Sequence, residues 1–446
     1  MGMQCVQCGT DNSLRDRTNN SGRCKNCNHP FVFEPTTVTD KKLAFTDPFF
    51  KKAIDDISSQ NILFFTPKQF LYFIDKRLKY PSALYQWEWI YSYFIFSLIF
   101  AIFILLPLLQ LIHNVITNYG MVFLTLFNIY NFFWIVELSK SNKSTQQSMS
   151  YRKINATKLQ VLAVIILAIG IPVSAIGGSF VGGITVVLLG LSSFSLGISQ
   201  KRRQHEIGEV FLVNAAQSDE WLRRWQTVNG TLEKLLNAPR QNALPATIDR
   251  EVSAYSFDRA IVCDSDEIAQ FLIANNVHFE NNCAILSISG YPQSIFDTVL
   301  EMLRRNADLK VYALHNASPS GVSLVHQLRT NPDWFANQLV TIFDLGISPR
   351  QILETSNLFV QKSVAMAETS RQLPDTVRQG LTAKELAWLD AGNFVELESF
   401  TPQRLLRVVN YGLAQSGDPQ SNNGLILVDN PVGYGGGYVF MSDSFG

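Results

Sequence analysis

The sequence predicts a multi-domain integral membrane protein with a cysteine-rich head, a bundle of four membrane helices and a C-terminal α/β domain. Three observations predict this: two Cys-x-x-Cys pairs near the start, four nearly uncharged apolar stretches, and strands alternating with helices in the second half. Charged residues make up 17% of the 446-residue chain, against roughly 25% in soluble proteins. The length exceeds one ordinary domain. A net charge of zero excludes a uniformly basic nucleic-acid binder.

The head, residues 1–34, holds the paired cysteines Cys5, Cys8, Cys24 and Cys27. Four thiolates at this spacing can close a tetrahedral metal site, which indicates a reducing compartment with a metal rather than a disulfide framework. The pattern resembles a zinc ribbon. Because four cysteines fill the coordination shell, the implied Zn²⁺ is structural. Such ribbons bind nucleic acid, protein or only their own metal, and the residues do not decide among these.

Residues 35–84 are predicted to form cytosolic amphipathic helices. Thr66 has the character of an N-cap, with Pro67 at the first helical position. The pair loosely resembles a small winged-helix or helix-turn-helix unit.

Residues 85–200 are predicted to hold four transmembrane helices, because each apolar stretch approaches the ~20 residues needed to cross a hydrocarbon core. An alternative, a buried helical core, is disfavoured since such helices seldom lack a polar face over this length. The predicted spans are 89–112, 119–138, 159–176 and 179–198.

Loop charges predict the orientation of these spans. Lys and Arg precede the first span, separate the second from the third, and follow the fourth, whereas 113–118 and 177–178 carry none. The positive-inside rule then makes this a multi-pass protein with both termini in the cytosol. No ionisable residue lies at a span centre, which favours an anchor over a channel. The Gly178-x-x-x-Gly182 spacing allows helices or two copies to pack, so a homo-oligomer stays open.

Behind the membrane region, 201–245 is predicted to be a helical linker and 246–350 an α/β domain. Apolar strands are expected at 259–264, 283–289, 309–315 and 339–346, with helices between them. Such alternation requires a Rossmann-like parallel sheet covered by helices, with functional residues at the carboxyl ends of the strands. Residues 351–446 are predicted to be a helical extension with a Gly-rich tail.

Motifs at those strand ends resemble a Toprim domain, closest to the A subunit of type IIB topoisomerases and the related meiotic double-strand-break enzymes. The resemblance covers 258–350, about a fifth of the chain. It rests on Asp264 after the first strand, where the family has Glu, and on three further motifs. These are Gly290-Tyr291-Pro292, Asn316-Ala317-Ser318-Pro319-Ser320-Gly321 and Asp344-Leu345-Gly346.

The chain departs from that family at the metal-binding acids. Where the family has Asp-Ala-Asp-Pro-x-Gly, this chain has Asn316 and Ser318 in place of both aspartates. Hard Mg²⁺ prefers carboxylate and water oxygens, so Asp264 with an amide and a hydroxyl makes a poor Mg²⁺ site. We therefore treat Asp264, Asn316 and Ser318 as vestigial positions and expect no catalytic residue and no Mg²⁺.

The same relatives carry a nucleophilic Tyr on a winged helix, and Tyr72 falls loosely at that position. Because four apolar segments separate it from the Toprim-like part, we expect Tyr72 to be an amphipathic side chain near the membrane. His278, His315 and His326 have no acid, Cys or His at ligand spacing, so none is expected to bind a metal.

Two functions follow from the sequence. The first is a membrane-anchored, non-catalytic binding or scaffold protein, whose cytosolic modules recognise a protein or nucleic-acid partner near the bilayer. The alternative is a membrane-tethered nucleic-acid-cleaving effector that uses Asp264 with Asp266 or Glu267 as an altered metal site. Convergence of Asp264, Asp266 and Asn316 on one point would favour the enzyme.

Overall fold

The computed structural model divides the chain into two compact units. One unit combines Met1–Leu78 with Val210–Tyr434, and the other combines Lys79–Glu209 with Gly435–Gly446. The structure describes residues 2–36, 43–79, 91–97, 119–140, 149–176, 180–202, 209–239, 257–306, 308–336, 338–354 and 358–415. The predicted Gly-rich tail and most of 89–112 lie outside these residues.

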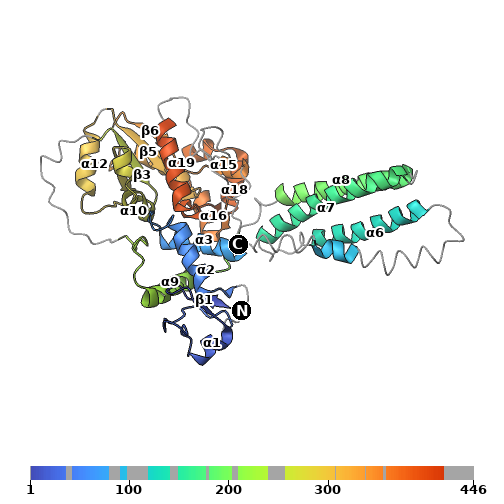
Figure 1. Cartoon of the computed structure of the whole chain (residues 1–446). Coiled ribbons are helices and arrows are strands. Elements are labelled where there is room, and N and C mark those ends of the chain that lie inside the picture. The colour runs from blue at the N-terminus through green and yellow to red at the C-terminus, as the bar shows by residue number, and fades with distance from the viewer. Residues whose placement is uncertain are drawn as a thin grey trace. The chain divides into compact units, whose positions relative to one another are not determined.

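The head of the first unit is a small cysteine-containing fold (Figure 1). β1 (Met3–Gln4) pairs antiparallel with β2 (Asp11–Asn12), and α1 (Leu14–Asn19) follows. Ser13 and Asp16 form a capping box at the start of α1, so two orphan backbone N–H groups are satisfied. These short elements place the two cysteine pairs opposite each other.

Three helices form an apolar core beside the head. They are α2 (Asp47–Ile57), α3 (Pro67–Lys79) and α9 (Ala215–Asn229). Phe50 and Phe70 of the first two helices are fully buried in this core with Trp225 of α9. The residues predicted as a linker, 201–245, thus include a helix that packs on the region preceding the apolar segment. Burying Trp221 and Trp225 is the physical reason, since aromatic side chains carry the largest apolar area.

Hydrogen bonds in this core join the part of the chain before the apolar segment to the part after it. The carboxylate of Asp75, fully buried near the end of α3, accepts the backbone N–H groups of Leu212 and Val213 at 2.6 and 3.2 Å. The segment from 79 to 209 is therefore an insertion in the first unit, and the chain returns beside the helix from which it left.

The predicted parallel sheet is confirmed. Its order is β4-β3-β5-β6 and every pairing is parallel. The chain steps from β3 to one side and then crosses back to the other, so the strand order reverses between β3 and β5. The carboxyl ends at such a switch point form the crevice where open α/β sheets bind ligands. The strands are β3 (Arg259–Cys263), β4 (Cys283–Ser287), β5 (Lys310–Leu314) and β6 (Thr341–Asp344).

Helices cover both faces of the sheet. One face packs against α10 (Asp266–Ala274), α11 (Val277–Glu280) and the C-terminal helices, and the other against α12 (Phe296–Arg304) and α14 (Leu324–Thr330). Alternate residues of each strand enter opposite cores, which explains why the strands are apolar throughout.

The remaining elements of the α/β part are α13 (Pro319–Val322), α15 (Pro349–Glu354), β7 (Gln361–Lys362), α16 (Val364–Arg371), α17 (Asp375–Gln379), α18 (Ala383–Asp390), β8 (Asn393–Phe394), η5 (Leu397–Ser399) and α19 (Pro402–Gln415).

The strand-like segment before α3 joins the helical core to the α/β part. Phe65 exchanges backbone hydrogen bonds with the 234–236 segment at 2.9 Å each. The side-chain amide of Asn275 accepts the N–H of Phe64 at 2.9 Å and donates to its carbonyl at 3.2 Å. An asparagine amide thus substitutes for a neighbouring strand and ties the segment before α3 to the C-terminal end of α10.

The second unit contains α6 (Tyr119–Lys140), α7 (Met149–Ile176) and α8 (Phe180–Arg202). In the described part of the chain two helices, Asn155–Ala175 and Phe180–Gln200, have the length and apolar composition needed to cross a membrane. Of the four predicted membrane helices, two therefore meet these requirements in the described part of the chain. α6 covers the predicted second span, and its little-exposed Asn128 and Asn131 are hydrogen-bonded to Thr185 and Tyr93, each at 2.8 Å.

Glycines bring α7 and α8 together. Gly183, Gly190 and Gly197 recur at seven-residue intervals on α8, and a Cβ at Gly190 would lie 2.7 Å from the side chain of Leu167. Ser193 donates a hydrogen bond to the carbonyl of Leu159 at 2.8 Å. Small residues and hydroxyl groups at such contacts are typical of helices that associate in lipid.

Candidate functional sites

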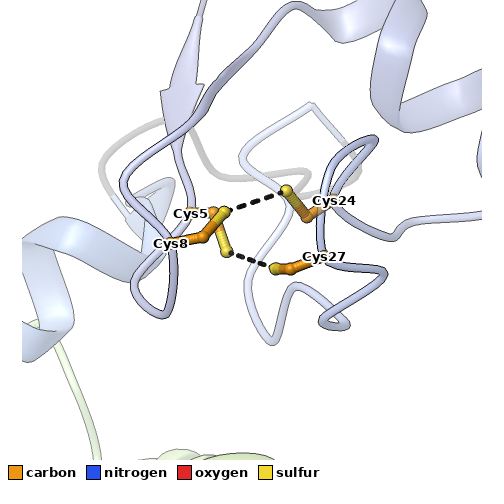
Figure 2. A group of neighbouring side chains, drawn as sticks. All are labelled: Cys5, Cys8, Cys24 and Cys27. Atoms are coloured by element: carbon orange, nitrogen blue, oxygen red, sulfur yellow. Dashed lines mark hydrogen bonds between the residues drawn. The ribbon is translucent and has the colours of Figure 1, made fainter.

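Cys5, Cys8, Cys24 and Cys27 lie together, with all four Sγ atoms within 4.8 Å of one another. The Sγ atoms of Cys5 and Cys27 are 3.6 Å apart, as are those of Cys8 and Cys24 (Figure 2). None of the four forms a disulfide. The four thiols therefore converge from two loops on one point.

Tight turns aim the sulfur atoms. In the first loop Gly9 donates its N–H to the carbonyl of Cys5 at 2.9 Å, with φ of +72°. The second loop repeats this at Asn28, which has φ of +61° and donates to the carbonyl of Cys24 at 3.0 Å. Glycine and asparagine tolerate this left-handed conformation better than other residues.

Asn12, fully buried, supports the second loop from β2. Its Nδ2 donates to the Sγ of Cys24 at 3.5 Å and its Oδ1 accepts the N–H of Lys25 at 2.9 Å. Hydrogen bonds from outside the ligand set orient metal ligands and stabilise thiolate charge. The sequence pattern of the cysteines does not reveal this residue, because its partners lie in the other half of the head.

The four cysteines are close enough to hold a metal ion, and the donor set suits zinc. A tetrahedral Zn²⁺ with Zn–S bonds of about 2.3 Å places its sulfurs about 3.8 Å apart, near the 3.6 Å seen for two of the pairs. Four sulfurs leave no position for substrate or water. Such a centre stabilises the fold and performs no chemistry.

The three strand-end positions predicted to be vestigial, Asp264, Asn316 and Ser318, are hydrogen-bonded to the chain itself. Oδ2 of Asp264 accepts the backbone N–H of Asn316 at 2.7 Å, where the paired strands β3 and β5 end. The Asn316 Oδ1 accepts the N–H of Leu397 at 2.7 Å. Ser318 caps α13 by accepting the N–H of Gly321 at 3.0 Å. Each side chain thus shapes a turn.

The other acids of the alternative metal site point elsewhere. Asp266 accepts hydrogen bonds from the hydroxyls of Ser287 and Ser289, each at 2.5 Å, at the end of β4. Glu267 is exposed on α10. Among the described residues, the cysteine group alone meets the distance criterion for a metal. Asp264 thus lies beside Asn316, whereas Asp266 is bonded to the end of β4.

A polar cluster missed by sequence reasoning lies where α3 meets the segment 393–399. We define this strand-end cluster as Lys68, Tyr72, Gln361, Glu396 and Glu398. Nζ of Lys68 is 2.7 Å from Oε1 of Glu396 and 3.8 Å from Oε1 of Glu398. The Tyr72 hydroxyl donates to Oε2 of Glu396 at 2.6 Å, and Gln361 contacts both.

Tyr72 differs from its expected place at a membrane surface. It is 4% exposed and packs against Phe211 and Phe359, with ring centroids 5.0 Å away in each case. Burial, with the charge of Glu396, raises the pKa of Tyr72 well above its ordinary value. The hydroxyl therefore stays protonated and donates a hydrogen bond, which does not suit a nucleophile.

Two carboxyls near this cluster have raised pKa values. Burial raises the pKa of Glu398 to about 7, although Lys68 opposes the shift. Burial likewise raises the pKa of Asp264 to about 6 against the hydrogen bond from Asn316. In both cases desolvation disfavours the charged form more than the neighbours favour it.

His315 has a partner that sequence spacing did not reveal. It is 1% exposed, and its Nε2 lies 3.0 Å from Oδ1 of Asp344 while its Nδ1 lies 2.8 Å from the carbonyl of Asn316. Burial lowers the pKa of His315, but the Asp344 charge and both hydrogen bonds outweigh it and raise the pKa to about 9. His315 is thus a doubly donating cation that ties the ends of β5 and β6 together.

No protein-family model and no curated protein sequence matches this chain. The likeness of its strand-end motifs to Toprim domains therefore stays a prediction from sequence, and the site geometry stands on its own.

Proposed function

We propose that this chain is a membrane-anchored, non-catalytic binding protein whose zinc-stabilised head and α/β body recognise a protein or nucleic-acid partner on the cytosolic side. One observation carries the proposal: the polar groups at the strand ends are used by the chain itself. Asp264, Asn316 and Ser318 each bind a backbone N–H. Strand-end side chains that hold the chain's own loops have little hydrogen-bonding capacity left for a reaction.

The insertion supports an even number of membrane crossings. Asp75 binds the backbone of Leu212 and Val213, so the chain leaves and re-enters the same unit. A segment that does so crosses a bilayer an even number of times. Four spans with both termini in the cytosol, as the loop charges favour, satisfy this requirement, and so do the two qualifying helices alone.

Topology is tested with single cysteines introduced into the full chain in sealed vesicles. The variant Asn114→Cys, between the first two predicted spans, is expected to react with an impermeant reagent from outside. The variant Asp219→Cys, on α9, is expected to react at its new thiol only after permeabilisation. Labelling of both new thiols from the same side would contradict the four-span topology.

The absence of catalysis is tested on the full-length protein in detergent micelles, with single- and double-stranded DNA and RNA and with Mg²⁺ or Mn²⁺. We expect retention of a partner without cleavage. Retention of nucleic acid that weakens with salt would assign the partner class. Retention of a protein partner without any nucleic acid would identify the partner class as protein. Cleavage abolished by Asp264→Ala would overturn the proposal.

One observation favours the alternative, a tethered nucleic-acid-cleaving effector. Oδ1 of Asp264 is buried and has no hydrogen-bond partner in the described part of the chain. A buried carboxylate oxygen left unpaired is costly and is typical of metal or catalytic sites. The cleavage assay with Asp264→Ala decides between the two functions.

A further inference from the structure

We propose that Glu396 and Glu398 form a divalent-cation site, which Lys68 of α3 occupies and closes in this structure. The Lys68 ammonium lies 2.7 Å from one carboxylate and 3.8 Å from the other. It therefore marks the position at which a cation is attracted by both. This site goes beyond the proposed function, because it needs neither a nucleic acid nor the cysteine head.

Glu398 has a carboxylate oxygen that Lys68 leaves without a partner. Glu398 is 3% exposed, and its Oε2 is buried without a hydrogen-bond partner among the described residues. Leaving a buried carboxylate oxygen unpaired costs more than a typical hydrogen bond contributes. Lys68 contacts only the other oxygen, Oε1, and at 3.8 Å. A divalent ion, which accepts bidentate carboxylates at about 2.3–2.6 Å in the case of Ca²⁺, would engage both oxygens.

A third carboxylate, that of Asp264, is close enough for its charge to interact with both glutamates. Asn316 accepts the N–H of Leu397, the residue between the glutamates, and donates its own N–H to Asp264. Two consecutive hydrogen bonds thus connect Asp264 to the Glu396–Glu398 segment. The buried Oδ1 of Asp264, like Oε2 of Glu398, has no partner in the described residues. Asp264 therefore adds negative charge near the two glutamates, at the carboxyl ends of β3 and β5, without being one of the proposed ligands.

The exposure of the partners shows how a cation would reach the site. The Lys68 side chain is 45% exposed, whereas those of Glu396 and Glu398 are 18% and 4% exposed. Lys68 thus covers the buried acids from the solvent side on a flexible stem. A divalent ion displaces it by supplying two charges in place of one. The exchange removes one contact that holds α3 to the α/β body.

The test measures Mn²⁺ binding to the full-length, zinc-loaded protein in detergent micelles at pH 8, by electron paramagnetic resonance of the free ion. Lys68→Met is expected to bind one Mn²⁺ about tenfold or more tightly than the wild type, because the competing charge is gone. The matched control Lys68→Arg keeps the cation and is expected to bind like the wild type. The double variant Lys68→Met, Glu398→Gln is expected to lose the gain.

Thermal unfolding keeps the test decisive if Lys68→Met folds poorly. Mn²⁺ is then expected to raise its unfolding temperature, with no such rise for the double variant. Equal binding by the wild type and Lys68→Met would overturn the proposal and leave the acids as a structural ion-pair cluster. A gain that survives Glu398→Gln, or a poorly folded variant that Mn²⁺ does not rescue, would overturn it as well.

Discussion

The cysteine head and the strand-end cluster are assembled in opposite ways. All four thiols of the head come from two loops within residues 5–27, and they converge within 4.8 Å. The strand-end cluster instead combines Lys68 and Tyr72 of α3 with Gln361, Glu396 and Glu398, more than 280 positions along the chain. A local site depends on its turns and its metal. A distributed site depends on everything that holds its elements together.

The largest expected effect is loss of the metal from the head. Cys24→Ser is expected to bind no zinc and to unfold residues 2–36, because structural zinc contributes about 10–16 kcal/mol in comparable peptides. Zinc per chain and hydrogen exchange measure this. Protection from hydrogen exchange is expected to vanish in the head and to persist in β3 and β4, because the stability of the sheet does not depend on the four head cysteines.

The matched control for that prediction is Cys283→Ala, which removes a buried thiol from β4 outside the metal group. It is expected to keep one zinc per chain. Loss of protection throughout the sheet in Cys24→Ser would contradict the separation of the two regions.

Asp75→Ala is expected to have the next largest effect. The substitution leaves the N–H groups of Leu212 and Val213 without their charged acceptor, at a cost of about 3 kcal/mol in the free energy of unfolding. Urea unfolding in detergent, followed by hydrogen exchange of the α9 backbone amides, measures it. Asp219→Ala, at an exposed position on α9, is expected to change little. Equal effects of the two substitutions would show that contacts other than those of Asp75 hold the segment after the insertion in place.

Glu398→Gln is expected to change the pH dependence of stability. Because the folded pKa of Glu398 is about 7, above its ordinary 4.5, the folded protein binds more protons and loses stability as pH rises from about 4.5 through 7. In Glu398→Gln this loss between pH 5 and 8 is expected to shrink by about 3 kcal/mol. Unfolding curves at both pH values measure it. An unchanged dependence of stability on pH would show that the Glu398 carboxylate is solvated and that its pKa is not raised by burial.

Asn275→Ala is expected to have the smallest effect. It removes two neutral hydrogen bonds to Phe64, each contributing about 1 kcal/mol. The exchange rate of the Phe64 amide is expected to rise while zinc content stays constant. If zinc content fell with it, the head and the distributed cluster would be less independent than their geometry indicates.

How far the sequence predicted each region follows from contact distance. The cysteine pairs and the four strands are confirmed, because spacing and alternating apolar runs are local signals. The buried Asn12, the pairing of His315 with Asp344 and the place of Tyr72 were missed, because each depends on residues distant in sequence. The membrane region was predicted as four spans from hydropathy, and two helices meet that criterion in the described residues.

By itself the sequence determined the donor set of the head, the apolar segments and the parallel α/β pattern, since each is written in residue type and short-range spacing. Only the tertiary structure decided that the regions before and after the apolar segment form one core around Phe50, Phe70 and Trp225. It also decided that Lys68 faces Glu396 and Glu398. The physical reason is burial: apolar area and paired charge select partners across the whole chain, and no local pattern records which distant surface a helix will meet.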